Sequence, residues 1–136
     1  MRSDCPLNFG LEIFGDKWTL LIIRDLIFFN KRYYNEFLNA EEGISTNILA
    51  DRLSLLEKQG IISRKKDENH KQKIIYRLTQ KGIDLLPVII EIGLWSDVYA
   101  GDLLNEKRDL ILGEAKKDKT KALQSLRERL IEEHLE

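Results

Sequence analysis

Apolar residues recur every three or four positions through most of the first sixty residues, which is the spacing of one face of an α-helix. This pattern predicts helices over about 7–14, 17–28, 33–39 and 46–59. Residues suited to helix ends stand at their boundaries: Asp16 and Ser45 are favourable N-caps, and Gly60 occupies the position after a helix where glycine is common. The amino-terminal part is therefore predicted to form four short helices.

Two stretches rich in β-forming residues, 61–66 and 73–78, follow the fourth helix, and six polar residues join them. This arrangement is typical of a β-hairpin with a long charged tip. Thr79 then caps a predicted long helix over about 80–100. Pro87 inside that helix should remove one backbone hydrogen bond and produce a kink.

The segment after this helix, 102–136, is highly charged. Its second half keeps a helical apolar spacing at Leu123, Leu126 and Leu130. Gly113 is expected to divide the segment into two helices, and helices this polar need a packing partner to be stable. The sequence thus predicts two domains, 1–100 and 101–136, the second being a charged helical extension.

The predicted order of elements indicates a mainly α fold with a small β-hairpin. Three helices followed by a hairpin form the plan of a winged helix-turn-helix, here with a long helix and a C-terminal helical extension added. A helix-turn-helix places its second helix in the DNA major groove, and in this chain that helix is 46–59. The hairpin, or wing, then reaches the flanking backbone.

The net charge of −1, from 22 basic and 23 acidic residues, looks at first like evidence against a nucleic-acid partner. Its distribution reverses that impression. Residues 52–81 contain nine basic and three acidic side chains, a net charge of +6, and the rest of the chain carries −7. A cationic segment directly after a candidate recognition helix favours phosphate contact. The alternative is a solvated hairpin whose lysines deter edge-to-edge aggregation.

The 46–59 helix has a leucine side expected to face the core, and a polar side with a polar first turn. The leucines are Leu49, Leu53 and Leu56. Asn47 carries an amide suited to adenine, and Asp51 either accepts from a cytosine amine or holds a neighbouring cation. Arg52 either reaches a phosphate or forms a structural ion pair. The candidate DNA-contacting residues are Ser45, Thr46, Asn47, Asp51, Arg52, Lys65, Lys66, Lys71 and Lys73.

Several other kinds of chemistry are not expected. The single cysteine, Cys5, excludes an internal disulfide and favours a reducing, cytoplasmic setting. His70 and His134 lie far apart without ligand-like spacing, so no metal site is expected. The sequence has no paired nucleophile and base and no phosphate-binding glycine loop, so we expect neither an enzyme nor a cofactor. No apolar stretch approaches the ~20 residues of a membrane span, and no signal-peptide run opens the chain.

A series of short strings points to a known family. The strings are Cys5-Pro6, residues 15–26, Asn35-Glu36-Phe37, residues 43–45, Arg52-Leu53, residues 60–62, residues 76–82 and residues 85–87. In this order they resemble the HxlR family of winged-helix transcription regulators, which are related to MarR. The resemblance covers about 5–99, and its specificity lies in the ordered series rather than in any one string.

The resemblance implies a homodimeric repressor or activator that binds a roughly palindromic operator in double-stranded DNA. Several family members sense electrophiles, oxidants or quinones through the cysteine that matches Cys5. The family dimer is built from the amino-terminal segment and the helix after the wing, so 1–100 would be a DNA-binding and dimerisation domain. The implied interface residues are Leu7, Leu11, Leu86, Ile90, Leu94 and Trp95.

The position of Cys5 supports a reactive thiol independently of the resemblance. A thiol just before a helix start lies at the positive end of the helix dipole and ionises more readily. The alternative is a small buried apolar residue. Among the departures from the family, Tyr33 stands where arginine is common, and 102–136 extends beyond the usual end. The leading expectation is a DNA-binding regulator; the competing one is a winged-helix module for small molecules or proteins that has lost DNA binding.

Overall fold

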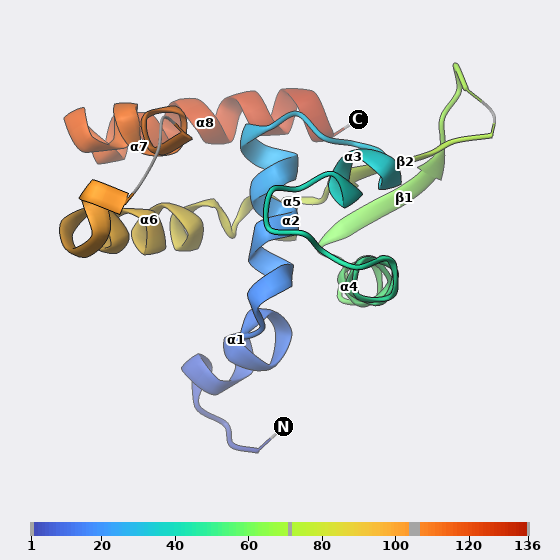
Figure 1. Cartoon of the computed structure of the whole chain (residues 1–136), viewed down its shortest axis with the longest axis horizontal. Coiled ribbons are helices and arrows are strands. Elements are labelled where there is room, and N and C mark those ends of the chain that lie inside the picture. The colour runs from blue at the N-terminus through green and yellow to red at the C-terminus, as the bar shows by residue number, and fades with distance from the viewer. Residues whose placement is uncertain (1, 71, 104–106, 136) are drawn as a thin grey trace. The chain divides into compact units, whose positions relative to one another are not determined.

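The computed structural model describes residues 2–70, 72–103 and 107–135 (Figure 1). The chain forms two compact units, Met1–Leu78 and Thr79–Glu136. The first contains α1 (Pro6–Phe14), α2 (Lys17–Phe28), α3 (Tyr34–Leu38), α4 (Thr46–Lys58), β1 (Ile62–Lys66) and β2 (Ile74–Leu78). These elements confirm the predicted order, and their bounds differ from the predicted ones by at most one residue at either end.

The helix ends in this unit follow the residues at their boundaries. Asp16 caps α2 by accepting hydrogen bonds from two backbone N–H groups of its first turn, and Ser45 caps α4 by accepting one from the N–H of Ile48. Gly60 has a φ of 72°, a left-handed conformation that side chains disfavour. The chain turns there from α4 into the wing.

The core of the first unit forms around α2, which packs against α1, α4 and β2. The α4 helix also packs on α3 and β1. Its leucines are buried, as the spacing predicted: Leu49, Leu53 and Leu56. Phe37 of α3 meets Tyr76 of β2 edge to face, with ring centroids 6.1 Å apart.

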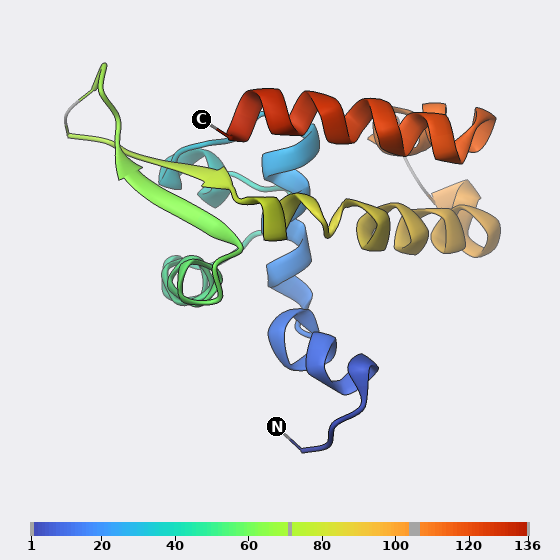
Figure 2. The same ribbon diagram turned by 180° about the vertical axis from the view of Figure 1, so that it is seen from behind.

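The wing is an antiparallel hairpin in which Ile62 pairs with Leu78 at one end and Lys66 with Ile74 at the other. Buried residues concentrate at the end nearest the helices, and the opposite end projects away from them (Figures 1 and 2). Helices α2, α3 and α4 with this hairpin form a winged helix-turn-helix, as predicted.

The second unit contains α5 (Gln80–Ile83), α6 (Leu86–Ala100), a 3₁₀ turn (Gly101–Leu103), α7 (Lys107–Lys117) and α8 (Lys119–His134). The prediction of one kinked helix over 80–100 is wrong. The backbone turns between α5 and α6, where the N–H of Leu85 bonds to the carbonyl of Gly82. Pro87 lies in the first turn of α6, where its missing N–H costs no hydrogen bond, so it begins a helix instead of bending one.

The prediction that Gly113 divides the C-terminal segment is also wrong. Helix α7 runs through Gly113, since one glycine costs a helix only about 1 kcal/mol. The division falls at Asp118, whose side chain accepts from the N–H of Lys121 and so begins α8.

Helix α6 packs with α7 and α8, and α8 runs alongside α6 (Figure 2). Gly93 of α6 allows a close approach, because a Cβ there would lie 2.8 Å from a methyl group of Leu112 in α7. The second unit begins at Thr79. The predicted division into domains 1–100 and 101–136 concerns which parts of the chain fold independently, and it stays a prediction.

Candidate nucleic-acid interface

Helix α4 divides sharply into a buried and an exposed side. Opposite its leucines, Thr46, Asn47 and Asp51 are exposed, as is the capping residue Ser45. The hydroxyl of Ser45 already accepts from the N–H of Ile48 at 3.2 Å, so its first role is structural. The first turn of α4 therefore exposes Thr46 and Asn47, whose hydroxyl and amide are groups of the kind that hydrogen-bond base edges.

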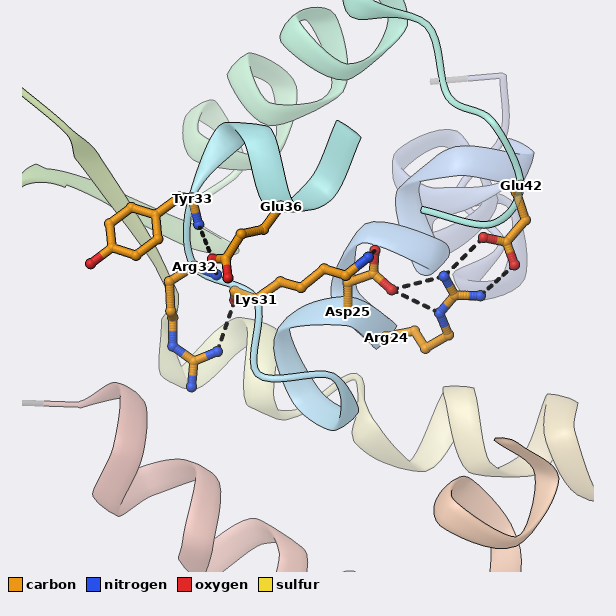
Figure 3. A network of polar contacts seen from close by, with 7 residues as sticks. All are labelled: Arg24, Asp25, Lys31, Arg32, Tyr33, Glu36 and Glu42. Carbon is orange, nitrogen blue, oxygen red and sulfur yellow. Dashed lines mark hydrogen bonds and ion pairs between the residues drawn. The ribbon is translucent and has the colours of Figure 1, made fainter. Parts of the chain in front are cut away.

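A network of charges holds the turn that precedes α4 against α2 (Figure 3). Arg24 of α2 binds Glu42 in a two-pronged contact, Nη1 to Oε2 at 2.7 Å and Nη2 to Oε1 at 3.0 Å. Its Nη2 also lies 2.8 Å from Oδ1 of Asp25. Because Glu42 lies three residues before the cap of α4, this network helps to set where the recognition helix begins.

Asp25 is the buried member of the network, with a side chain only 2% exposed. Lys31 supplies a second cation, with Nζ 3.1 Å from Oδ2 of Asp25. Burial acts against the charge of Arg24, but its contacts with Glu42 and Asp25 outweigh burial and raise the pKa of the guanidinium. The guanidinium of Arg24 therefore stays charged at neutral pH.

Arg52 pairs with carboxylates, which favours the structural role over the phosphate role. Its Nε lies 2.8 Å from Oδ2 of Asp16, and it also binds Asp51. Asp16 is the residue that caps α2, so the ion pair joins the start of α2 to the middle of α4. The contact with Asp16 raises the pKa of Arg52. Asp51 holds this neighbouring cation, as one of its two predicted roles requires.

A further contact ties α3 to the start of α4. The hydroxyl of Tyr34 donates to the backbone carbonyl of Thr46 at 3.2 Å. The sequence does not predict this contact, the pairing of Arg24 with Glu42, or the ion pair that Asp16 makes with Arg52 in addition to capping α2. One signal was available: Arg24 and Asp25 are adjacent opposite charges within an otherwise apolar stretch, 20–29, where ions need partners.

The exposed basic side chains of the wing lie on β1 and near the tip of the hairpin. Arg64, Lys65 and Lys66 of β1 are exposed, and Lys73 is exposed just before β2. Lys71, also predicted to contact DNA, lies outside the described residues. The described wing cations belong to the same compact unit as α4.

Cys5 lies at the N-cap position of α1, and its thiol is exposed rather than buried. The backbone N–H groups of Asn8 and Leu7 lower the pKa of this thiol. This environment matches the dipole argument made from the sequence and makes the reactive thiolate more abundant near neutral pH.

The residues expected at a dimer interface differ in their exposure. Leu7 and Leu11 of α1 and Trp95 of α6 are exposed, with Leu7 and Trp95 exposed to 70% and 66%. Leu86 and Ile90 are 1% and 0% exposed, so their assignment to a partner surface is corrected: they belong to the core of the chain. Leu94 is half-buried. Exposed α6 residues that the sequence analysis did not assign are Ile92, Val98 and Tyr99.

Within the described part of the chain, no group of three or more His, Cys, Asp or Glu residues is placed to hold a metal ion. None of its helices combines the length and apolar character needed to cross a membrane.

Known proteins similar to this chain are helix-turn-helix regulators. The model of the HxlR-like helix-turn-helix family matches residues 13–103. The HTH-type transcriptional regulator sll1512 of Synechocystis is 35% identical over 86 residues, which are 63% of this chain and 63% of that protein. The HTH-type transcriptional regulator YodB of Bacillus subtilis is 34% identical over 106 residues, 76% of this chain and 94% of YodB.

Solved structures show the same similarity. The crystal structure of PA1607 superposes with a TM-score of 0.67 at 34% identity, covering 73% of this chain and 68% of PA1607. The redox regulator HypR in its oxidised form gives 0.61 at 28% identity, over 69% of this chain and 96% of HypR. Quinone-bound YodB from B. subtilis gives 0.58 at 31% identity, over 70% of this chain and 99% of YodB.

The family match covers the helix-turn-helix, the wing and α6, and it stops before α7. It confirms the family expected from the ordered sequence strings, and it confirms that the chain is not an enzyme, because the family consists of transcriptional regulators. The chain belongs to the HxlR-like helix-turn-helix family of transcriptional regulators.

Proposed function

We propose that this regulator is a homodimer that recognises a pseudo-palindromic operator, with α4 of each subunit in the major groove and each wing on the flanking backbone. The observation that carries this proposal is the joint placement of an exposed polar first turn on α4 and a cationic wing in one compact unit. A helix provides base contacts and the wing provides sequence-independent phosphate contacts.

The side chains then divide by role. Thr46 and Asn47 contact base edges, and Asn47 is suited to a bidentate pair with adenine. Lys65, Lys66 and Lys73 contact phosphates. Arg52 positions α4 through Asp16 instead of contacting DNA. Because the acidic remainder of the chain repels phosphate, the dimer presents only its cationic side to the duplex.

Two exposed apolar surfaces support dimer formation. Helix α1 exposes Leu7, Phe9 and Leu11, and α6 exposes Trp95 with Tyr99, whose rings lie 5.1 Å apart. Large exposed aromatic side chains are typical anchors of protein interfaces. A two-fold dimer would set two α4 helices at the spacing of successive major grooves, roughly 34 Å.

We further infer that Cys5 is a regulatory thiol. Its exposure and its lowered pKa support reaction with an oxidant or an electrophile. HypR is a redox regulator with a structure in its oxidised form, and YodB has a quinone-bound structure. An adduct at the start of α1 would act on the dimer surface that this helix contributes, and so on the spacing of the two α4 helices.

DNA binding is tested by genomic footprinting of the full-length protein, followed by anisotropy titrations on the footprinted duplex and a shuffled duplex of equal composition. We expect protection of a two-fold symmetric site and binding at least about a thousandfold tighter than to the shuffled duplex. Absence of binding to every duplex at low salt would instead support the competing function, a winged-helix module without DNA binding.

The thiol is tested separately. Diamide or benzoquinone should weaken operator binding by the wild-type protein and leave Cys5→Ser unaffected. Equal responses of the two proteins would remove Cys5 from regulation without touching the DNA-binding proposal.

A further inference from the structure

Tyr33, the residue immediately before α3, makes a long-range hydrogen bond to the wing. Its hydroxyl donates to Oδ2 of Asp67 at 2.5 Å. Asp67 follows β1 directly and is 8% exposed, although its neighbours Lys66 and Glu68 are exposed. A buried carboxylate among exposed charges at the wing tip requires an explanation.

Asp67 also organises the turn of the wing. Its Oδ1 accepts from the N–H of Asn69 at 2.9 Å, and its own N–H donates to the carbonyl of Lys73 at 3.0 Å. The hydrogen bond to Tyr33, followed by the N–H of Asn69, lowers the pKa of Asp67. The same carboxylate raises the pKa of Tyr33. One oxygen of Asp67 therefore fixes the turn, and the other fixes the wing to the helix-turn-helix.

Tyr33 is itself held in place. Its N–H donates to Oε1 of Glu36 at 3.0 Å, part of the capping box that begins α3 (Figure 3). On the wing side, Lys73 places its Nζ 5.2 Å from the centre of the Tyr33 ring. The ring thus lies between a rigid helix start and the basic end of the wing.

The wing has a second anchor nearer its base, where the N–H of Tyr76 donates to the carbonyl of Arg32 at 2.8 Å. Asp67 pairs with Lys73, three residues farther toward the tip, which is roughly 10 Å of extended chain. A hairpin held at one point can swing about it, whereas a hairpin held at two points this far apart has a fixed direction.

Charge alone makes Asp67 unfavourable for a DNA-binding wing, because a carboxylate repels phosphates. We propose that Tyr33 and Asp67 form a latch that fixes the direction of the wing, so that its lysines meet the phosphates while α4 lies in the groove. Tyr33 is in this view a positioning residue; the inference rests on the proposed DNA-binding function.

The test begins with Tyr33→Phe, which removes only the hydroxyl. Tyr34→Phe is the matched control, because it removes the same atom from the next residue, whose partner is Thr46 rather than the wing. We expect Tyr33→Phe to weaken operator binding about tenfold and to accelerate amide exchange in the wing of the free protein. Tyr34→Phe should leave wing exchange unchanged.

A second pair separates the latch from simple electrostatics. Asp67→Ala and Glu68→Ala remove the same charge from adjacent positions. Glu68→Ala should tighten binding to any duplex, whereas Asp67→Ala should weaken it. The Tyr33→Phe/Asp67→Ala double variant should bind no more weakly than Asp67→Ala alone, because both changes break one contact.

Three outcomes would overturn the latch: unchanged binding by Tyr33→Phe, tighter binding by Asp67→Ala, or weaker binding by Tyr33→Phe with normal wing exchange, which would assign the hydroxyl to DNA. The wild-type titration tells this failure apart from failure of the proposed function. If the wild-type protein binds no duplex, the function fails and the latch role fails with it.

Discussion

Helices α4 and α6 are similar in length, 13 and 15 residues, but they expose opposite chemistry. The exposed side of α4 carries short polar groups such as Asn47, whereas that of α6 carries Trp95 and Val98. A helix with a polar exposed side can face water in the free protein and DNA in a complex. A helix with an apolar exposed side is stable in water only at a cost, so it indicates a protein partner.

The strongest test of this contrast places a charge on the exposed side of α6. Trp95→Asp should weaken the dimer by more than about a hundredfold, about 3 kcal/mol, because it buries an unpaired carboxylate where an aromatic anchor was. Analytical ultracentrifugation measures the change. Leu110→Asp is the control, since Leu110 is equally exposed but lies on α7. A wild-type monomer, or equal effects of the two variants, would remove α6 from the interface.

A second substitution removes the ion pairs that hold the turn before α4 against α2. Arg24→Met leaves Glu42 without its two-pronged partner and leaves the buried carboxylate of Asp25 paired with Lys31 but not with Arg24. We expect a loss of about 3 kcal/mol in the free energy of unfolding, measured by urea denaturation. Arg64→Met, at an exposed wing position, should change it by less than about 0.5 kcal/mol. Equal stabilities would show that the network does not hold the turn.

A smaller effect is expected from the exposed side of α4 itself. Asn47→Ala should reduce discrimination at one base pair per half-site by about 1–3 kcal/mol and leave binding to unrelated duplexes unchanged. Competition titrations with single-base operator variants measure this. Ser54→Ala, on the same exposed side but farther from the first turn, should leave every base preference intact. The reverse result would move the base contacts along the helix.

The smallest expected effect concerns Cys5. Because its pKa is lowered, the thiolate persists to lower pH than in an ordinary cysteine, and alkylation by iodoacetamide should reach its half-maximal rate at lower pH. The control is Ser54→Cys in a Cys5→Ser background, which places an exposed thiol within a helix instead of at its start. Coincident pH profiles would show that the start of α1 does not activate the thiol.

The same two helices show what the sequence could predict. In α4, apolar residues occupy one side only, so Leu49, Leu53 and Leu56 could be assigned to the core correctly. In α6, apolar residues occupy all sides, and periodicity cannot distinguish the inner from the outer side. The resemblance implies Leu86 and Ile90 at the interface, and the apolar pattern of α6 cannot correct this, although both residues are buried. The packing of α7 and α8, which no local pattern records, decides which side of α6 stays exposed.

Single residues predict a helix end correctly where one side chain or one φ angle determines it. They predict it wrongly where one residue is compatible with two local structures. Asp16, Ser45 and Gly60 fixed helix ends because capping depends on a single side chain or φ angle. Pro87 fits two roles, a kink within a helix or the first turn of a new helix, and the turn at Leu85, which no local signal predicts, selects the second. The contact of Arg52 with Asp16 spans 36 residues, so only the fold brings the two together.

The central claim is that the wing contacts phosphates while α4 reads bases. It is tested most directly by the salt dependence of operator binding for the wild-type protein and for Lys65→Ala/Lys66→Ala. The wild-type affinity should fall about a thousandfold or more between roughly 50 and 200 mM salt. The double variant should bind every duplex more weakly, with a log–log slope shallower by about 3 to 4 for the dimer. Identical slopes for the two proteins would contradict the claim.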